Sequence, residues 1–120
     1  MRTNAFQFVT GQALNAGFNS AAVGLNQVFG YTIQGVITGT PTGTFTLQAS
    51  ADPWYSNPTT AQLPSNWTTI ANTSQAVSTA GTFIYNVSDP WYNWVRLVYV
   101  DGSSGTSTAT LSATIDTKGQ

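Results

Sequence analysis

The stretch that decides the fold covers residues 81–100 and reads GTFIYNVSDPWYNWVRLVYV. Its first half alternates apolar and polar residues, with Phe83, Tyr85 and Val87 on one face. Alternation with a period of two indicates a half-buried β-strand. Ser-Asp-Pro at 88–90 then predicts a turn, because Asp hydrogen-bonds its own backbone and Pro has no N–H. The stretch therefore predicts two strands joined by a tight loop.

Residues 94–100, the second of these strands, are apolar on both faces. One face carries Val95, Leu97 and Tyr99, and the other carries Trp94, Val98 and Val100. Such a strand is central in its sheet or is covered by another subunit. Arg96 is the one charged residue in the run, and its guanidinium needs water or a carboxylate. We expect Arg96 to contact another subunit or to form an ion pair within the chain. The candidate carboxylates are Asp89, Asp101 and Asp116.

The same alternation recurs along the rest of the chain. We expect long strands at 27–38, 44–51 and 106–115. Shorter candidates lie at 6–9, 21–25, 66–70 and 75–77, between stretches rich in turn residues. No stretch has the 3.6-residue period of a long amphipathic helix. About seven or eight short strands predict an all-β fold, an antiparallel β-sandwich of jelly-roll or Ig-like type with no substantial helix.

Particular positions in these strands carry further expectations. Phe6 and Phe8 share one face of their strand by alternation, and residues 10–20 predict a loop. Gly35 lies on the apolar face of its strand, where glycine marks a bulge or the close approach of another backbone. The residues that share that face are Phe29, Tyr31, Ile33 and Ile37.

Length and charge bound the class of protein. The chain has 120 residues, which predicts a single domain over 1–120, with 1–20 as a candidate extended arm. Three basic and four acidic residues give a net charge of −1, and with no basic footprint we expect no nucleic-acid partner. A soluble monomer normally carries more surface charge. Either much of the surface faces other protein, or this is simply a β-protein rich in hydroxyl side chains.

The N-terminal residues and the lengths of the apolar runs argue against a signal peptide and against membrane insertion. The first residues lack the apolar core of a signal peptide, and no apolar run approaches the roughly 20 residues of a membrane-spanning helix. We therefore expect synthesis in the host cytoplasm without a signal peptide, and no membrane association. The chain has no Cys, so a disulfide framework is excluded.

Catalysis is disfavoured by the residue inventory. The chain has no His, Cys or Glu, so the usual triads and thiol chemistry are unavailable. Its carboxylates lie in turns or near the C-terminus, where Asp is common for backbone reasons. No loop has the carboxylate density of a dedicated calcium site. We expect no enzyme activity, no catalytic residue, no cofactor and no metal.

A repeated tetrapeptide is the strongest functional signal. Asp-Pro-Trp-Tyr occurs at 52–55 and again at 89–92, each time directly after a predicted strand. If the two strands run the same way, both loops lie at one end of the sandwich. The aromatics then form a paired binding patch, since Trp and Tyr dominate binding hot spots, or each Trp caps the core. The candidate interface or ligand residues are Trp54, Tyr55, Trp91, Tyr92, Trp94 and Arg96.

A sugar is an alternative ligand for these aromatics, because flat Trp and Tyr faces stack on pyranose rings. This interpretation makes the chain a carbohydrate-binding module for host adsorption, with a host glycan as partner. The polar groups that would support it are Asp52, Asn57, Asp89 and Asn93.

Several segments carry a resemblance to a known group of proteins. They are residues 29–34, 38–50, 66–70, 86–89 and 94–99, followed by a Gly-rich hairpin into the last strand. Together they resemble small β-sandwich structural proteins of tailed-bacteriophage virions, of the capsid-decoration or head-fibre type, over roughly residues 20–119. The loop at 52–65 departs from this pattern, being longer and more aromatic than the expected short turn.

The resemblance implies a non-enzymatic virion component on the capsid surface. A capsid decoration or cement protein, or a head-fibre-associated subunit, is the implied role, and a tail or neck subunit is the alternative. Its implied partners are the major capsid protein or other virion proteins. A homo-oligomer is also implied, with a trimer as the expected state because such proteins commonly sit on three-fold sites.

Overall fold

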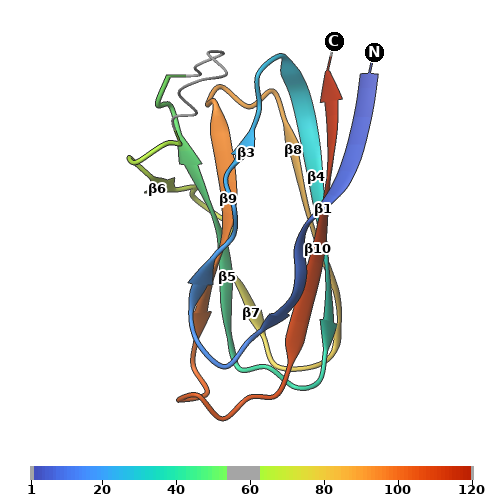
Figure 1. Ribbon diagram of the computed structural model, residues 1–120, viewed down its shortest axis with the longest axis vertical. Helices are drawn as coiled ribbons and strands as arrows, with labels where there is room; N and C mark the ends of the chain where they lie inside the picture. Colours follow the sequence, from blue (N-terminus) through green and yellow to red (C-terminus); the bar gives the residue numbers. More distant parts are fainter. Residues whose placement is uncertain (1, 54–62, 120) are drawn as a thin grey trace.

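The computed structural model describes residues 2–53 and 63–119, and over these residues it contains β-strands and turns but no helix. All the strand pairs are antiparallel and form two sheets that face each other (Figure 1). The predicted antiparallel β-sandwich is therefore confirmed. Within the same residues, no helix is long and apolar enough to cross a membrane.

The first sheet is four-stranded, with the order β1-β10-β4-β8. Its strands are β1 (Arg2–Ala13), β10 (Thr110–Gly119), β4 (Val28–Thr38) and β8 (Gly81–Ser88). The β1 and β10 strands, which are the first and last strands along the chain, pair antiparallel. Both ends of the chain therefore lie at the same end of the sandwich (Figure 1). The β10 strand begins four residues later than predicted, because Thr106 bonds to Ser103 and the Ala109 N–H bonds to the Ser107 hydroxyl within the preceding loop.

The second sheet is six-stranded and centres on the pairing of β9 with β5. Its strands are β2 (Phe18–Asn19), β3 (Val23–Gly24), β5 (Gly43–Ser50), β6 (Thr68–Thr69), β7 (Gln75–Val77) and β9 (Trp94–Asp101). Three short strands, β2, β3 and β6, have two residues each, and β2 and β3 pair with β9. The β9 strand therefore has neighbours on both sides, which confirms the central position predicted from its two apolar faces.

Two β-bulges change which side chains face the core. The β1–β10 register shifts between Gln7 and Val9, which makes Phe8 an extra residue and leaves Val9 buried. A bulge of this kind moves the side chains that follow it to the other face. Phe8 still packs against the core, and Val9, which strict alternation would place on the outer face, is buried beside it. Residues 10–13, expected in a loop, continue β1 beyond the bulge.

The second bulge lies at the start of β4. Gly119 pairs with Val28 and Lys118 pairs with Gly30, so Phe29 is the extra residue. Val28 packs against the core instead, and Phe29 is 50% exposed. The expectation that Phe29 shares a face with the buried residues of β4 is therefore wrong. Its outward position leaves an apolar ring on the surface at one end of the sandwich.

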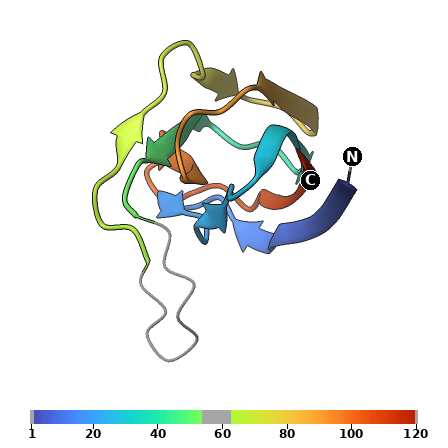
Figure 2. The same ribbon diagram turned by 90° about the horizontal axis from the view of Figure 1, so that it is seen from above.

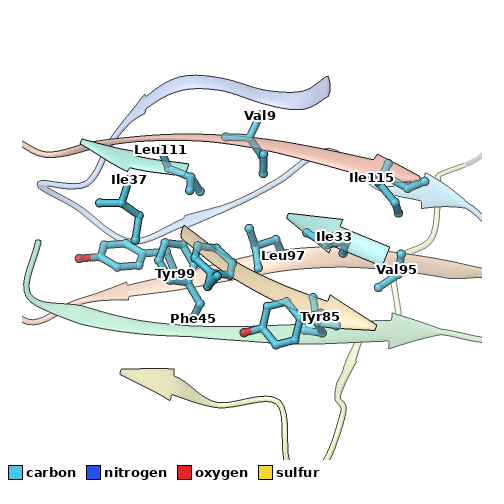
Figure 3. Packing of buried hydrophobic residues seen from close by; sticks show 14 of the residues in the cluster. Val9, Ile33, Ile37, Phe45, Tyr85, Val95, Leu97, Tyr99, Leu111 and Ile115 are labelled. Atoms are coloured by element: carbon cyan, nitrogen blue, oxygen red, sulfur yellow. The ribbon is translucent and has the colours of Figure 1, made fainter. Parts of the chain in front are cut away.

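The core fills the space between the sheets with side chains from both (Figure 3). The final strand and Ala109 just before it contribute the predicted set of small and branched residues. They are Ala109, Leu111, Ala113 and Ile115, all almost fully buried. From the opposite sheet, Phe45 and Tyr99 lie with their ring centroids 4.7 Å apart. Aromatic pairs at this separation contribute beyond the area that they bury.

Gly35 is required because an aromatic ring lies directly over it. Gly35 pairs with Phe83 across β4 and β8, and a Cβ at Gly35 would overlap the Phe83 ring. The Phe83 ring in turn stacks on Phe45 of the second sheet, with centroids 4.8 Å apart and planes at 28°. The expected close approach at Gly35 is thus made by a side chain, which joins the two sheets.

Substituting Gly35→Ala is expected to destabilise the fold by about 1–3 kcal/mol, the usual cost of overpacking a core. The physical reason is that the new methyl group must displace the Phe83 ring from its stack on Phe45. Denaturant unfolding measures the loss. The matched control is Val36→Ala, on the exposed face one residue further along the strand, and it should change stability much less. Equal stability of Gly35→Ala and the wild type would contradict this description of the core.

Candidate functional site

The two copies of the Asp-Pro-Trp-Tyr repeat begin at the same end of the sandwich. The β8 strand is antiparallel to β4, and a short turn reverses the chain from β4 into β5, so β5 and β8 run the same way (Figure 1). Asn93, just after the second copy, connects the two. Its backbone N–H donates to the Ser50 carbonyl at 3.0 Å, and its Nδ2 donates to the Asp52 carbonyl at 2.9 Å. The predicted common end, called the repeat end below, is confirmed.

In the first copy, the Asp52 carboxylate holds the loop closed. Its Oδ2 accepts hydrogen bonds from the backbone N–H groups of Ser65 at 2.7 Å and Asn66 at 3.0 Å. Its Oδ1 accepts a third from the Asn66 side chain at 3.1 Å. The Asn66 backbone and side-chain donors, followed by Ser65, lower the Asp52 pKa, because they stabilise the ionised form. Trp54 and Tyr55 of this copy lie outside the described residues.

In the second copy, the tryptophan and the tyrosine side chains lie in different environments. Asp89 adopts a positive φ of 53°, which turns the chain, and its N–H donates to the Phe29 carbonyl at 2.7 Å. Trp91 is then 95% exposed, whereas Tyr92 packs against the core. The interpretation that each Trp caps the core is therefore wrong for Trp91. Tyr92 makes that contact instead.

Tyr92 meets a buried tyrosine from β4. The two hydroxyl oxygens of Tyr92 and Tyr31 lie 2.7 Å apart in a hydrogen bond. Burial, and then the hydrogen bond to Tyr92, raise the pKa of Tyr31 far above its ordinary value. Burial also raises the pKa of Tyr92, and the bond from Tyr31 partly opposes this shift. Both phenols stay neutral at physiological pH, so the pair acts as a structural link.

Trp91 borders a small hollow in the surface at the repeat end. The hollow has a volume of about 190 Å³. It is lined by Val28, Phe29, Asp89, Pro90 and Trp91. Pockets for whole drug-sized ligands run to about 300–1,000 Å³, so this one suits a single apolar side chain or the edge of a ring. Four of its five lining residues are apolar, and Asp89 is the fifth.

The sequence analysis identified Trp91 and Asp89 as candidate site residues, but it did not identify Val28 and Phe29, which also line the hollow. Val28 and Phe29 reach it because of the bulge at the start of β4. Because Phe29 is apolar and in phase with Tyr31 and Ile33, the sequence alternation shows no sign of the bulge. The one available signal was the pair of turn residues Asn26 and Gln27 before the strand.

Trp94 and Arg96 lie away from the hollow, on β9. Trp94 is 8% exposed and pairs with Ser50 across the sheet. The Arg96 guanidinium donates from Nε and Nη2 to the Gln48 side-chain oxygen at 2.8 and 2.6 Å, and lies 4.3 Å from the centroid of the Trp67 ring. Burial lowers the pKa of Arg96, although the guanidinium remains charged.

The expected ion pair of Arg96 with an Asp is therefore wrong within the described part of the chain. Gln48 lies directly opposite Arg96 in the β5–β9 ladder and satisfies the guanidinium first. Asp101 instead caps its own loop, with Oδ1 accepting from the Ser103 N–H at 2.9 Å. Ser103, first through its side chain and then through its backbone, lowers the Asp101 pKa. Asp116 belongs to the other sheet.

Comparisons with known proteins yield a fold likeness. No family model matches the chain, and no curated protein does. Among solved structures, the chain is similar to the SPBc2 prophage-derived protein YomS, with a TM-score of 0.55 and 14% sequence identity. The likeness covers 97% of this chain and 92% of that one. At this identity it establishes a shared fold over the whole length of both proteins.

Residues 2–53 and 63–119 contain no cluster of three or more His, Cys, Asp or Glu side chains that could hold a metal.

Substitutions within the second repeat copy are expected to separate surface from core. Trp91→Ala should change the free energy of unfolding by no more than about 0.5 kcal/mol, as at other exposed positions. Tyr92→Phe should cost about 1 kcal/mol, because it removes the hydrogen bond to Tyr31. Denaturant unfolding monitored by circular dichroism measures both. Unfolding of the Trp91→Ala variant would contradict its placement on the surface.

Proposed function

We propose that this chain is a non-enzymatic structural protein of a tailed-bacteriophage particle, and that it acts through protein–protein contacts. Two lines support the phage context. Segments across residues 20–119 resemble virion β-sandwich proteins, and the fold is that of a prophage-derived protein over nearly the whole chain. The proposed position is the capsid surface, as a decoration or cement protein or a head-fibre-associated subunit.

The observation that carries the mode of action is the exposed Trp91 beside an apolar hollow. Tryptophan is the residue type most enriched in binding hot spots, and such anchors sit next to small pockets. Here the positive φ of Asp89 directs the chain so that Trp91 leaves the core and stands over Val28 and Phe29. A partner side chain that enters the hollow would be covered by the indole ring.

The hollow is too small to hold a partner alone. Stable interfaces bury at least about 1,000 Å² in total, so the proposed contact extends from Trp91 over the polar surface around it. The chain as a whole is rich in Thr, Ser, Asn and Gln and has only three basic and four acidic residues, and burying uncharged polar groups costs less than burying charges. The proposed partners are the major capsid protein or other virion proteins, together with further copies of the chain.

Copy number tests the proposed location. Quantitative mass spectrometry of purified particles, made by the phage or prophage that encodes the chain, is expected to find it in every preparation. Hundreds of copies per particle would agree with a shell decoration protein, since a capsid repeats its sites many times. About five to twelve copies would instead place it at a vertex, neck or tail ring. Complete absence from particles would overturn the proposal.

A carbohydrate-binding role in host adsorption is the second candidate, and the flat exposed face of Trp91 favours it. The supporting polar groups are largely occupied, however. Asp52 is engaged with Ser65 and Asn66, and the Asn93 amide donates to backbone carbonyls. Asn57 lies outside the described residues. Only Asp89 of the proposed set lines the hollow.

The Trp91→Ala variant separates these two candidates when it is supplied during particle assembly. If Trp91 serves assembly, particles are expected to lack the variant chain. Normal incorporation with loss of adsorption to host polysaccharide would instead favour the carbohydrate-binding role.

A further inference from the structure

We propose that residues 3–7 of β1 pair with the same residues of a second copy of the chain. The two segments would run antiparallel about a two-fold axis and join the first sheets of both copies into one continuous sheet. The inference concerns the outer edge of the first sheet and not the hollow beside Trp91, and it does not depend on a phage origin. It rests on the open edge of β1, on the absence of protection there and on the exposure of its side chains.

The outer edge of β1 offers regular backbone hydrogen-bonding groups. Among the described residues, the only ladder partner of β1 is β10, and pairing is in step from Arg2–Gly119 to Gln7–Thr114. The Asn4 carbonyl faces β10, since it accepts a hydrogen bond from the Thr117 hydroxyl at 3.3 Å. In an antiparallel ladder the N–H and C=O of one residue point the same way, and neighbours alternate.

It follows that the backbone groups of Thr3, Ala5 and Gln7 face away from β10. They form an evenly spaced row of donors and acceptors along the open edge. A second strand that paired with this edge would meet the same pattern of backbone donors and acceptors that an interior strand presents to its neighbour.

This edge lacks the usual protection against pairing. Natural edge strands are blunted by charged residues, prolines or bulges. Residues 3–7 read TNAFQ, with no charge and no proline, and the first register shift comes only after Gln7. At the opposite edge of the same sheet, formed by β8, side-chain hydrogen bonds join the edge strand to a neighbouring segment. There, the Gln75 side chain donates to the Ile84 carbonyl of β8 at 3.3 Å, and the Tyr85 hydroxyl donates to the Thr73 carbonyl at 2.7 Å.

The side chains of this segment are uncovered on both faces. Residues 3–7 are all exposed, whereas Val9, after the bulge, is buried. Phe6 lies opposite the fully buried Ile115 and is still 41% exposed. In Figure 2 the N-terminal part of β1 extends away from the second sheet. With Ala5 opposite Ala5 of a second copy, Phe6 would lie opposite Asn4 of that copy and diagonal to its Phe6, a spacing that aromatic side chains can bridge.

A second copy fits this edge better than a strand of another kind. With Ala5 opposite Ala5, the outward-facing residues Thr3 and Gln7 also meet as pairs, and all three sets of backbone groups are satisfied. The neutral segment brings no like charges together. Since each chain has one such edge, a two-fold contact closes after two copies and does not grow into a fibre.

The test begins with the mass of the full-length chain by light scattering at about 100 μM, well above the micromolar range of moderate affinities. The wild type is expected at twice its 12.7 kDa monomer mass. Ala5→Pro removes an outward N–H and no bond to β10, so this variant should remain folded and become monomeric. Ala5→Val keeps the N–H and is the matched control, which should stay dimeric. A monomeric wild type, a dimeric Ala5→Pro variant or a three-fold mass would each overturn the proposal.

A cysteine pair keeps the proposal testable if the proline variant fails to fold. The chain has no Cys, so Ala5→Cys introduces a single thiol, which the proposed register places opposite its own copy. Mild oxidation is expected to yield a disulfide-linked dimer rapidly. The control is Ala13→Cys, at the far end of β1, which should link much more slowly. Equal linking of the two variants would overturn the proposal. Detection in virus particles is independent of this result, so the two proposals can fail separately.

Discussion

The stack of Phe83 on Phe45 is the contact on which the rest of the structure depends. These rings come from different sheets, and their centroids lie 4.8 Å apart. The Phe83 ring can occupy this place because Gly35 has no side chain below it. With Tyr99 packed on the other side of Phe45, the aromatic cluster sets how β5 and β8 face each other. Since both strands run the same way, their ends meet, and the two loops of the repeat begin side by side.

The alternation of residues 81–88 and of the other predicted strands was sufficient to predict the sandwich, because a period of two determines which face is buried. The run at 94–100, apolar on both faces, predicted the central position of β9. It could not predict the bulges at Phe8 and Phe29. A bulge inserts one residue into a ladder, and the alternation on either side looks unchanged. The partner of Arg96 was missed for a related reason. Gln48 is 48 residues away along the chain, and only the strand register brings the two side chains together.

The repeat illustrates how neighbours decide what identical residues do. Asp52 closes its loop by accepting bonds from Ser65 and Asn66, whereas Asp89 turns the chain through a positive φ. After the second turn the tyrosine enters the core and the tryptophan leaves it. A sequence pattern predicted that these aromatics mattered and that both loops share an end. It could not divide them into a structural and a surface residue, because that division depends on Tyr31 and on the bulge at Phe29.

The measurement that tests the central claim most directly is the solvent accessibility of Trp91 in the free chain and in the assembled particle. Hydroxyl-radical footprinting with mass spectrometry, using an added reference peptide to match the radical dose, reports oxidation of the indole ring. Our account predicts rapid oxidation of Trp91 in the free chain, where the residue is 95% exposed, and strong protection in particles. Equal oxidation in both states would contradict the proposal that Trp91 anchors a contact with other virion proteins.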